Sequence, residues 1–161
     1  DHVSEALYRR KRPFFAQGKA ASRSSMLEEF KRHKNAVLLG TNSFWEGVDI
    51  QGESLSMLIL FKLPFQVPSE PIVEALIDKL DREQKDSFMH FMLPNALLRL
   101  RQGFGRLIRS RGDRGIVLVM DSRVSNKYYG QYFKQVLPAK SLEMRSEVEL
   151  LSEVSSFFGL T

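Results

Sequence analysis

Four short apolar runs, separated by longer helix-like stretches, constrain the fold of this chain most strongly. The runs do not alternate apolar with polar residues, and they cover residues 14–16, 36–39, 55–63 and 116–120. Strands that helices cover on both faces have such patterns, which are typical of parallel sheets. Helical spacing is found at residues 72–84, 86–91, 95–109 and 127–136, and again after Pro138. The alternation predicts an α/β domain with a mostly parallel sheet.

The N-terminal quarter has its own helix signals. A helix over residues 4–11 is expected to end before Pro13, since proline cannot continue it. Ser24 or Ser25 is expected to cap a second helix, which ends with cations at residues 31–34 as the helix dipole favours.

Length and composition are those of an ordinary single-domain protein. The chain has 161 residues, of which 43% are hydrophobic and 27% charged. Single cores usually hold about 100–200 residues, so we expect residues 1–161 to form one domain. No apolar run approaches the ~20 residues of a transmembrane helix, and the first residues do not resemble a signal peptide. The absence of an initiator Met suggests a fragment of a longer protein.

Cysteine is absent from the sequence. This excludes disulfides, thiolate zinc sites, iron–sulfur ligation and cysteine nucleophiles within this segment. It also fits a cytoplasmic location.

The loops that follow the apolar runs are the candidate sites, because ligands of open parallel sheets collect at the carboxyl ends of the strands. These loops are rich in Gly, Ser, Pro, Asn or charged residues, and they cover residues 17–25, 40–52, 64–71 and 121–127.

Residues 40–49, Gly-Thr-Asn-Ser-Phe-Trp-Glu-Gly-Val-Asp, form the first segment with candidate chemistry. Two carboxylates lie on either side of a glycine, and two hydroxyls and the N–H groups of a turn suit a phosphate. The members in question are Thr41, Ser43, Glu46, Gly47 and Asp49. The spacing fits equally well a strand–helix loop with a capping residue and a core tryptophan.

Residues 102–109, Gln-Gly-Phe-Gly-Arg-Leu-Ile-Arg, form the second segment. On a helix, Arg106 and Arg109 would share a face, with Gln102 one turn before the first of them. Guanidinium groups in such a place stabilise charge on a phosphoryl group during its transfer, as an arginine finger does. The glycines here do not form a dinucleotide-binding fingerprint, because the third glycine is missing.

Charge is sorted along the chain, whose formal net charge is +5. Residues 99–114 contain six Arg and one acid, whereas residues 70–86 contain six acids. Arginine binds phosphate oxygens through its planar fork, so the basic segment fits a polyanionic partner. A solvated helix face would explain the same run of charge.

Both segments resemble known helicase motifs. Residues 102–109 resemble motif VI of superfamily 2 helicases, and residues 40–49 resemble motif V. Three further matching segments are residues 63–65 with the following Pro68, 121–123 and 128–130. In this order, over about residues 10–140, they resemble the DinG branch of the XPD/DinG helicases. The resemblance implies the second RecA-like motor domain of a DNA helicase, a three-layer α/β domain in which helices flank the sheet.

The resemblance also implies roles by motif position. Arg106 and Arg109 would contact the γ-phosphate of ATP, and Gln102 would orient that phosphate. The residues implied beside the nucleotide are Glu46, Gly47 and Asp49. Those implied on the DNA backbone are Thr41, Ser43, Gln17, Gly18 and Lys19.

The family places ATP between two motor domains, and the first of these carries the phosphate loop and the metal-binding acids. This chain has no Gly-x-x-x-x-Gly-Lys-Ser/Thr. We therefore expect Mg²⁺ to be held mainly by a first motor domain outside this chain, no metal on the chain itself, and little ATPase activity from the chain alone. The implied partners are single-stranded DNA, with 5′→3′ movement, and the first motor domain, with no membrane. In many relatives an iron–sulfur cluster sits in that first domain, so the lack of cysteine here does not test for it.

Three alternatives stay open on the sequence alone. A non-catalytic nucleic-acid-binding module would explain the arginine-rich segment but not the joint occurrence of the two motifs. Another kind of nucleotide-binding enzyme, such as a Rossmann dehydrogenase, would need a glycine-rich strand–helix turn near the N-terminus. The lack of such a turn in this sequence counts against that alternative. Some DinG-like proteins carry an exonuclease domain, so the parent protein could degrade DNA in place of unwinding it.

Overall fold

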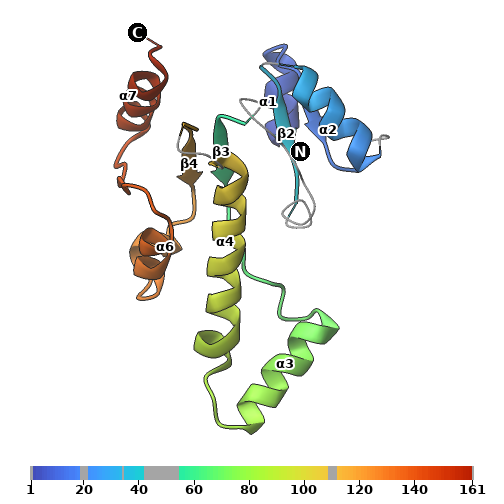
Figure 1. Ribbon diagram of the computed structural model, residues 1–161, viewed down its shortest axis with the longest axis vertical. Helices are drawn as coiled ribbons and strands as arrows, with labels where there is room; N and C mark the ends of the chain where they lie inside the picture. Colours follow the sequence, from blue (N-terminus) through green and yellow to red (C-terminus); the bar gives the residue numbers. More distant parts are fainter. Residues whose placement is uncertain (1, 19–21, 34, 42–54, 109–111, 161) are drawn as a thin grey trace.

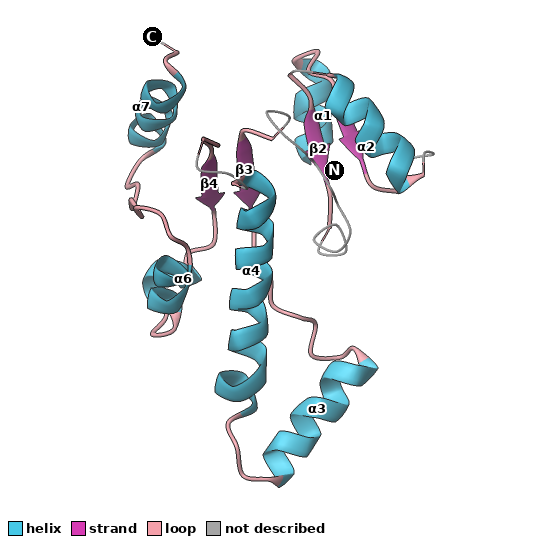
Figure 2. Cartoon of the chain, in the orientation of Figure 1, coloured by secondary structure: helices cyan, strands magenta, loops and turns pink. Residues whose placement is uncertain are grey.

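The computed structural model, shown in Figure 1, describes residues 2–18, 22–33, 35–41, 55–108 and 112–160. Helices and short strands alternate along these residues, as the apolar runs predict (Figure 2). The strands are β1 (Phe14–Ala16), β2 (Val37–Leu39), β3 (Met57–Leu60) and β4 (Ile116–Val119). Each of the four apolar runs therefore contains one strand.

The described strands pair in parallel. β1 lies beside β2 with Phe14 opposite Val37, and β3 lies beside β4 with Met57 opposite Ile116. Within the described residues these are two separate two-stranded sheets. The α/β class with parallel strands is confirmed.

Two helices accompany the first pair of strands. Helix α1 (His2–Arg9) ends before Lys11, whose φ of 52° is left-handed, and Pro13 follows. Helix α2 (Arg23–Arg32) begins after Ser22, whose side chain accepts a hydrogen bond from Ser25 N at 3.2 Å. The predicted cap at Ser24 or Ser25 is therefore wrong by two or three residues, because both lie inside the helix.

The remaining helices lie between β3 and β4 or follow β4. Helix α3 (Pro71–Arg82) extends away from the strands (Figure 1). A π-helical segment, η3 (Phe88–Met92), runs directly into the long helix α4 (Leu93–Leu107). After β4 come α5 (Arg123–Asn126), α6 (Gly130–Val136) and α7 (Glu147–Phe158).

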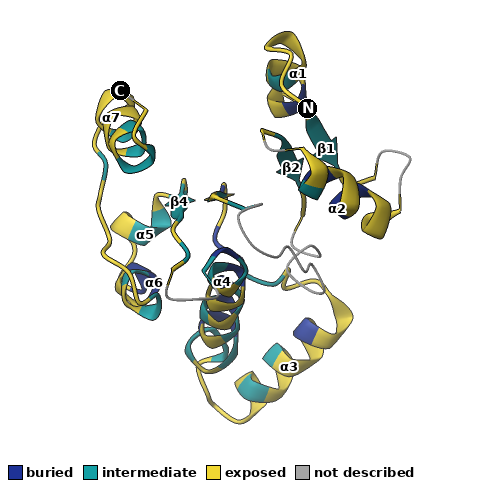
Figure 3. Cartoon of the chain, turned by 45° about the horizontal axis from the view of Figure 1, so that its top comes forward, coloured by how far each residue is buried: buried dark blue, intermediate teal, exposed yellow. Residues whose placement is uncertain are grey.

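The main core forms where α4 packs against β3 and α6. Leu93, Ala96 and Leu100 lie on one side of α4 and are almost fully buried. They meet side chains from the end of β3 and from α6, which are Leu60, Leu63, Tyr129 and Phe133. Figure 3 shows this buried side of α4 against the exposed side. The apolar residues of α4 recur at helical spacing, so the helix buries one side and exposes the other.

The strands are less covered than their sequences predict. Most strand residues are half-buried, and Ile59 in β3 is 44% exposed. Among the described residues each strand has one partner, so the structure shows one paired edge for each strand. Leu60 is the one described strand residue that is buried, with 6% of its surface exposed.

No helix among the described residues has the length and apolar character that crossing a membrane requires.

Candidate nucleotide and nucleic-acid interface

Two predicted site residues meet at the carboxyl ends of β1 and β2. Gln17 follows β1 and Thr41 lies two residues after β2. The Gln17 side-chain oxygen Oε1 accepts hydrogen bonds from Thr41 N at 3.1 Å and from Thr41 Oγ1 at 2.8 Å. Gln17 N donates to Leu39 O at 3.0 Å, which extends the pairing of the strands by one residue. The two predicted loops are thus joined at the edge where a parallel sheet binds its ligands.

Gly18 gives the first of these loops its sharp turn. Its φ of +88° lies in the region that residues with a side chain rarely adopt. Both Gln17 and Gly18 are exposed at this turn. Lys19, also predicted to contact DNA, lies outside the described residues.

The other predicted residues of the second loop lie outside the described residues as well. These are Ser43, Glu46, Gly47 and Asp49.

Gln102 and Arg106 lie one turn apart near the end of α4. Gly103 and Leu107 in the same stretch are buried, so they fix the last turn of the helix against the core. Gln102 is exposed and Arg106 is half-buried. Within the described part of the chain, no hydrogen bond or ion pair engages the Arg106 guanidinium. A guanidinium in that state can accept an anion as its partner.

The helix does not extend to Arg109. It ends at Leu107, and Ile108 has an extended backbone with φ −119° and ψ 107°. The helix predicted over residues 95–109 therefore ends two residues early, and the orientation of Arg109 relative to Arg106 stays a prediction. Arg109 itself lies outside the described residues.

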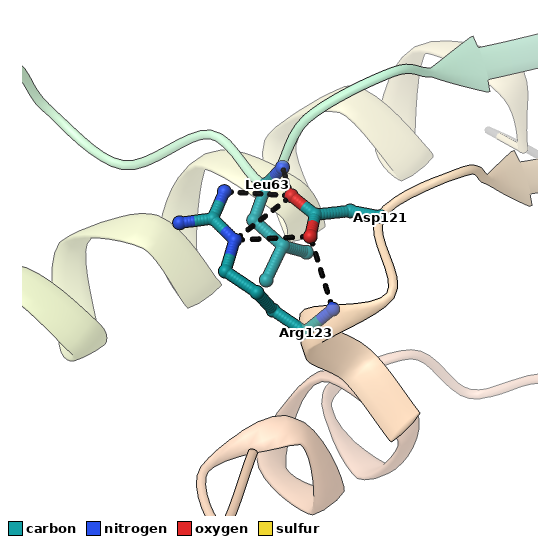
Figure 4. A network of polar contacts seen from close by, with 3 residues as sticks. All are labelled: Leu63, Asp121 and Arg123. Carbon is teal, nitrogen blue, oxygen red and sulfur yellow. Dashed lines mark hydrogen bonds and ion pairs between the residues drawn. The ribbon is translucent and has the colours of Figure 1, made fainter. Parts of the chain in front are cut away.

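A polar network joins the carboxyl ends of β3 and β4 (Figure 4). Asp121 follows β4 by two residues, and its Oδ2 accepts a hydrogen bond of 2.8 Å from the backbone N–H of Leu63, beyond β3. The guanidinium of Arg123 grips the same carboxylate, with Nη2 at 2.6 Å from Oδ2 and Nε at 2.9 Å from Oδ1. Arg123 N also donates to Oδ1 at 3.1 Å. The predicted loops 64–71 and 121–127 are thus tied together.

The hydrogen bonds from Arg123 lower the pKa of the Asp121 carboxyl from 3.8 to about 2, and the N–H of Leu63 adds to the effect. Burial acts in the opposite direction but is outweighed. The Asp121 side chain is 8% exposed, whereas that of Arg123 is 38% exposed. A charged, nearly buried carboxylate therefore anchors an arginine that remains partly open to solvent.

Replacing Asp121 by Asn is expected to lower the free energy of unfolding by about 1–2 kcal/mol at pH 7. One pKa unit corresponds to about 1.4 kcal/mol. Because the Arg123 side chain is partly exposed, solvent screening reduces the contribution of the ion pair to stability. Because folding lowers the pKa of Asp121, its contribution is present above pH ~4 and disappears as the pH falls towards 2. Urea unfolding at pH 7, 4 and 2.5 measures it.

The matched control is Asp81→Asn on the exposed part of α3. That change should alter the free energy of unfolding by less than about 0.5 kcal/mol. A difference between Asp121→Asn and the wild type that stays constant from pH 7 to pH 2.5 would contradict the assignment of the low pKa.

The sequence did not predict the contact between Asp121 and Leu63. Leu63 and Asp121 are 58 residues apart, and spacing does not reveal such a pair. A local signal was present, since an Asp directly after an apolar run, with an Arg two residues later, suits a carboxylate-anchored turn.

No group of three or more His, Asp or Glu side chains that could hold a metal ion occurs in the part of the chain that the structure describes.

The family described as the helicase C-terminal domain matches residues 1–140. Among curated relatives, the ATP-dependent DNA helicase YoaA of Haemophilus influenzae is 42% identical over 74% of this chain and 19% of its own length. The 3'-5' exonuclease DinG of Bacillus subtilis is 38% identical over 87% of this chain and 15% of its own length. The ATP-dependent helicase DinG of Mycobacterium tuberculosis is 37% identical over 78% of this chain and 19% of its own length. The chain thus spans less than a fifth of each of these relatives.

Proposed function

Because the chain belongs to the helicase C-terminal domain family, in its DinG-like branch, we propose that it is the second RecA-like motor domain of an ATP-dependent DNA helicase. Residues 1–161 would be one domain of a longer, cytoplasmic protein that moves along single-stranded DNA. The first motor domain, which holds the phosphate loop and most of the Mg²⁺ ligands, would be its partner. An iron–sulfur cluster, where the longer protein has one, would belong to that first motor domain and not to residues 1–161.

The observation that carries the nucleotide role is the placement of Gln102 and Arg106. They lie one turn apart on α4, and the half-buried Arg106 has no partner among the described residues. In the proposed mechanism Arg106 acts as an arginine finger on the γ-phosphate, and Gln102 orients that phosphate. The residues assigned to the nucleotide by motif position alone are Arg109, Glu46, Gly47 and Asp49.

The hydrogen bonds between Gln17 and Thr41, at the carboxyl ends of β1 and β2, support the DNA role. Because the two loops are tied by hydrogen bonds, they present a preorganised polar surface rather than two independent turns. Polar side chains in such turns bind phosphate oxygens without reading the base sequence. We propose that the DNA strand contacts this surface, formed by Gln17, Gly18 and Thr41. Lys19 and Ser43 are assigned to the DNA by motif position alone.

The cycle follows from these two surfaces. Arg106 draws the domain towards ATP that is bound on the first motor domain, and it stabilises charge on the phosphoryl group during hydrolysis. When phosphate leaves, the guanidinium loses its partner and the two domains separate. The surface at Gln17 and Thr41 would bind the DNA strand in either the closed or the open state and release it in the other. Each cycle would therefore move the domain along the DNA.

Gln17→Glu is expected to weaken binding of the full-length protein to single-stranded DNA at least about tenfold. Glutamate has the same shape and still accepts both hydrogen bonds from Thr41, but it places a negative charge beside the proposed phosphate path. Titration of a labelled oligonucleotide measures the Kd. Gln84→Glu, an exposed position after α3, makes the same charge change elsewhere and is expected to have little effect. Equal Kd values for Gln17→Glu and Gln84→Glu would remove this turn from the DNA path.

Degradation of DNA is the second candidate activity, since the Bacillus subtilis relative is named an exonuclease. In that case the motor domain would regulate, with ATP, a nuclease on another part of the parent. Incubating the full-length protein with end-labelled DNA, with and without ATP, separates the two activities by whether the strand is shortened. A third candidate is a non-catalytic nucleic-acid-binding domain, which predicts DNA binding without ATP hydrolysis.

A further inference from the structure

Five aromatic rings gather beyond the carboxyl ends of β3 and β4, and one of them is open to solvent. The aromatic cluster consists of Phe65, Phe88, Tyr128, Tyr129 and Phe133. Tyr129 and Phe133 are buried, whereas Tyr128 is 66% exposed. A large, exposed ring on the rim of a packed cluster is a preformed surface for another flat, apolar group.

The Tyr128 ring is held in place although it is exposed. Its centroid lies 5.3 Å from that of Tyr129 and 6.5 Å from that of Phe88, both at steep interplanar angles. Its hydroxyl contacts the sulfur of Met89 at 3.7 Å. The backbone on either side is fixed too, because α5 is anchored by the Asp121–Arg123 pair and Gly130 packs tightly against Val124 O.

Cations accompany the exposed ring. Lys127 precedes Tyr128, and its N–H donates to Arg123 O at 3.1 Å, which places the two cationic residues one turn apart. Lys62 precedes Leu63, whose N–H is held by Asp121. Two acids of neighbouring segments are paired with cations, Asp121 with Arg123 and Glu143 with Lys134. Within the described residues neither Lys62 nor Lys127 has an ion-pair partner.

We propose that Tyr128 is a stacking platform for a base of the single-stranded DNA, with Lys127 contacting the adjacent phosphate. This inference rests on the proposed function and adds a second contact region, at the β3–β4 edge, to the one at the β1–β2 edge. A ring stacks on any base, because every base has a π-face, so the contact suits a motor that moves regardless of sequence. Only an unpaired strand offers its base faces, so Tyr128 would also favour single-stranded over double-stranded DNA.

The test measures the Kd of the full-length protein for a labelled single strand across a series of salt concentrations. Tyr128→Ala is expected to weaken binding about 5- to 100-fold at every salt concentration, since stacking is lost and no charge is removed. Tyr128→Phe keeps the ring and is expected to bind within about twofold of the wild type. Lys127→Ala is expected to reduce the slope of log Kd against log salt by about 0.7, the value for one phosphate contact on a single strand.

An abasic strand separates stacking from a general effect on the fold. The wild type should lose affinity for it, whereas Tyr128→Ala should bind the abasic strand as the wild type does, because only the base contact has been removed. Tyr8→Ala, at a tyrosine that is 79% exposed on α1, is the matched control and should bind like the wild type.

The inference is overturned if Tyr128→Ala binds the normal strand as tightly as the wild type, or if it loses as much affinity for the abasic strand as for the normal one. It is also overturned if Tyr128→Phe loses as much as Tyr128→Ala, since the hydroxyl and not the ring would then matter. A wild-type protein that binds neither strand overturns the proposed function, and this inference with it.

Discussion

Arg106→Ala is expected to reduce the maximal DNA-stimulated ATPase rate of the full-length protein by about 10³-fold or more. Arginine fingers contribute factors of ~10³–10⁵, because they neutralise charge that develops on the phosphoryl group in the transition state. A thousandfold loss corresponds to about 4 kcal/mol of transition-state stabilisation. Arg106 suits this role because the buried Gly103 and Leu107 fix the last turn of α4, while its guanidinium has no partner among the described residues.

The two control variants for Arg106 are Arg106→Lys and Arg101→Ala. Arg106→Lys keeps the charge but loses the planar fork, so it should recover only a small part of the rate. Arg101→Ala removes the same charge from an exposed position of α4 and should keep most of the rate at saturating DNA. If Arg106→Ala hydrolysed ATP normally and lost only DNA affinity, the arginine-rich segment would be a binding surface and not part of the ATP site.

Gly130→Ala is expected to lower the free energy of unfolding by about 2–4 kcal/mol, since overpacking typically costs ~1–3 kcal/mol and more where backbone must move. A Cβ atom at Gly130 would lie 2.0 Å from Val124 O and 2.6 Å from Val124 C. Both atoms belong to the backbone, so no side-chain rotation relieves the clash. The chain between α5 and α6 would have to move, which would disturb the packing of Tyr129 and Phe133 in the core.

Thermal unfolding of the 161-residue chain, followed by circular dichroism, measures this effect. A loss of that size corresponds to a midpoint lower by roughly 5–15 °C. Gly105→Ala is the matched control, because no atom lies within 4 Å of a Cβ at that position in α4. That change should raise the midpoint slightly, since alanine favours a helix over glycine by ~0.5–1 kcal/mol. Equal midpoints for Gly130→Ala and the wild type would contradict the close approach of α5 and α6.

The strands and most helices could be predicted because their signals are local. Non-alternating apolar runs place β1 to β4, and polar breaks between them place the helices. The capping error shows the limit of such signals. Ser22, Ser24 and Ser25 have the same side chain, and only the backbone conformation decides which one begins the helix.

The region around Pro94 shows a second limit. A proline lacks the N–H that an α-helix needs and normally ends or begins one, so the sequence predicts two separate helices. In the structure the π-helical turns of η3 precede Pro94, and the helix continues through it. A π-helical segment changes the hydrogen-bond register locally, which accommodates the missing donor.

The candidate sites were predictable as loops but not as contacts. Loop positions follow from the ends of the apolar runs, and Gln17 and Thr41 indeed meet at one edge. The tie between Leu63 and Asp121 joins residues 58 positions apart, so it depends on the pairing of β3 with β4. The exposure of Tyr128 depends on which of two adjacent tyrosines fits the core, which the sequence does not distinguish.

One titration tests the central claim most directly, that this domain couples ATP hydrolysis to DNA through two separate surfaces. The ATPase rate of the full-length protein is measured against the concentration of single-stranded DNA for the wild type, Arg106→Ala and Gln17→Glu. We expect DNA to stimulate the wild type. Arg106→Ala should lower the maximal rate and leave the half-stimulating DNA concentration unchanged, whereas Gln17→Glu should raise that concentration and leave the maximal rate unchanged. A wild type that DNA does not stimulate, or two variants that change the same quantity, would contradict the account.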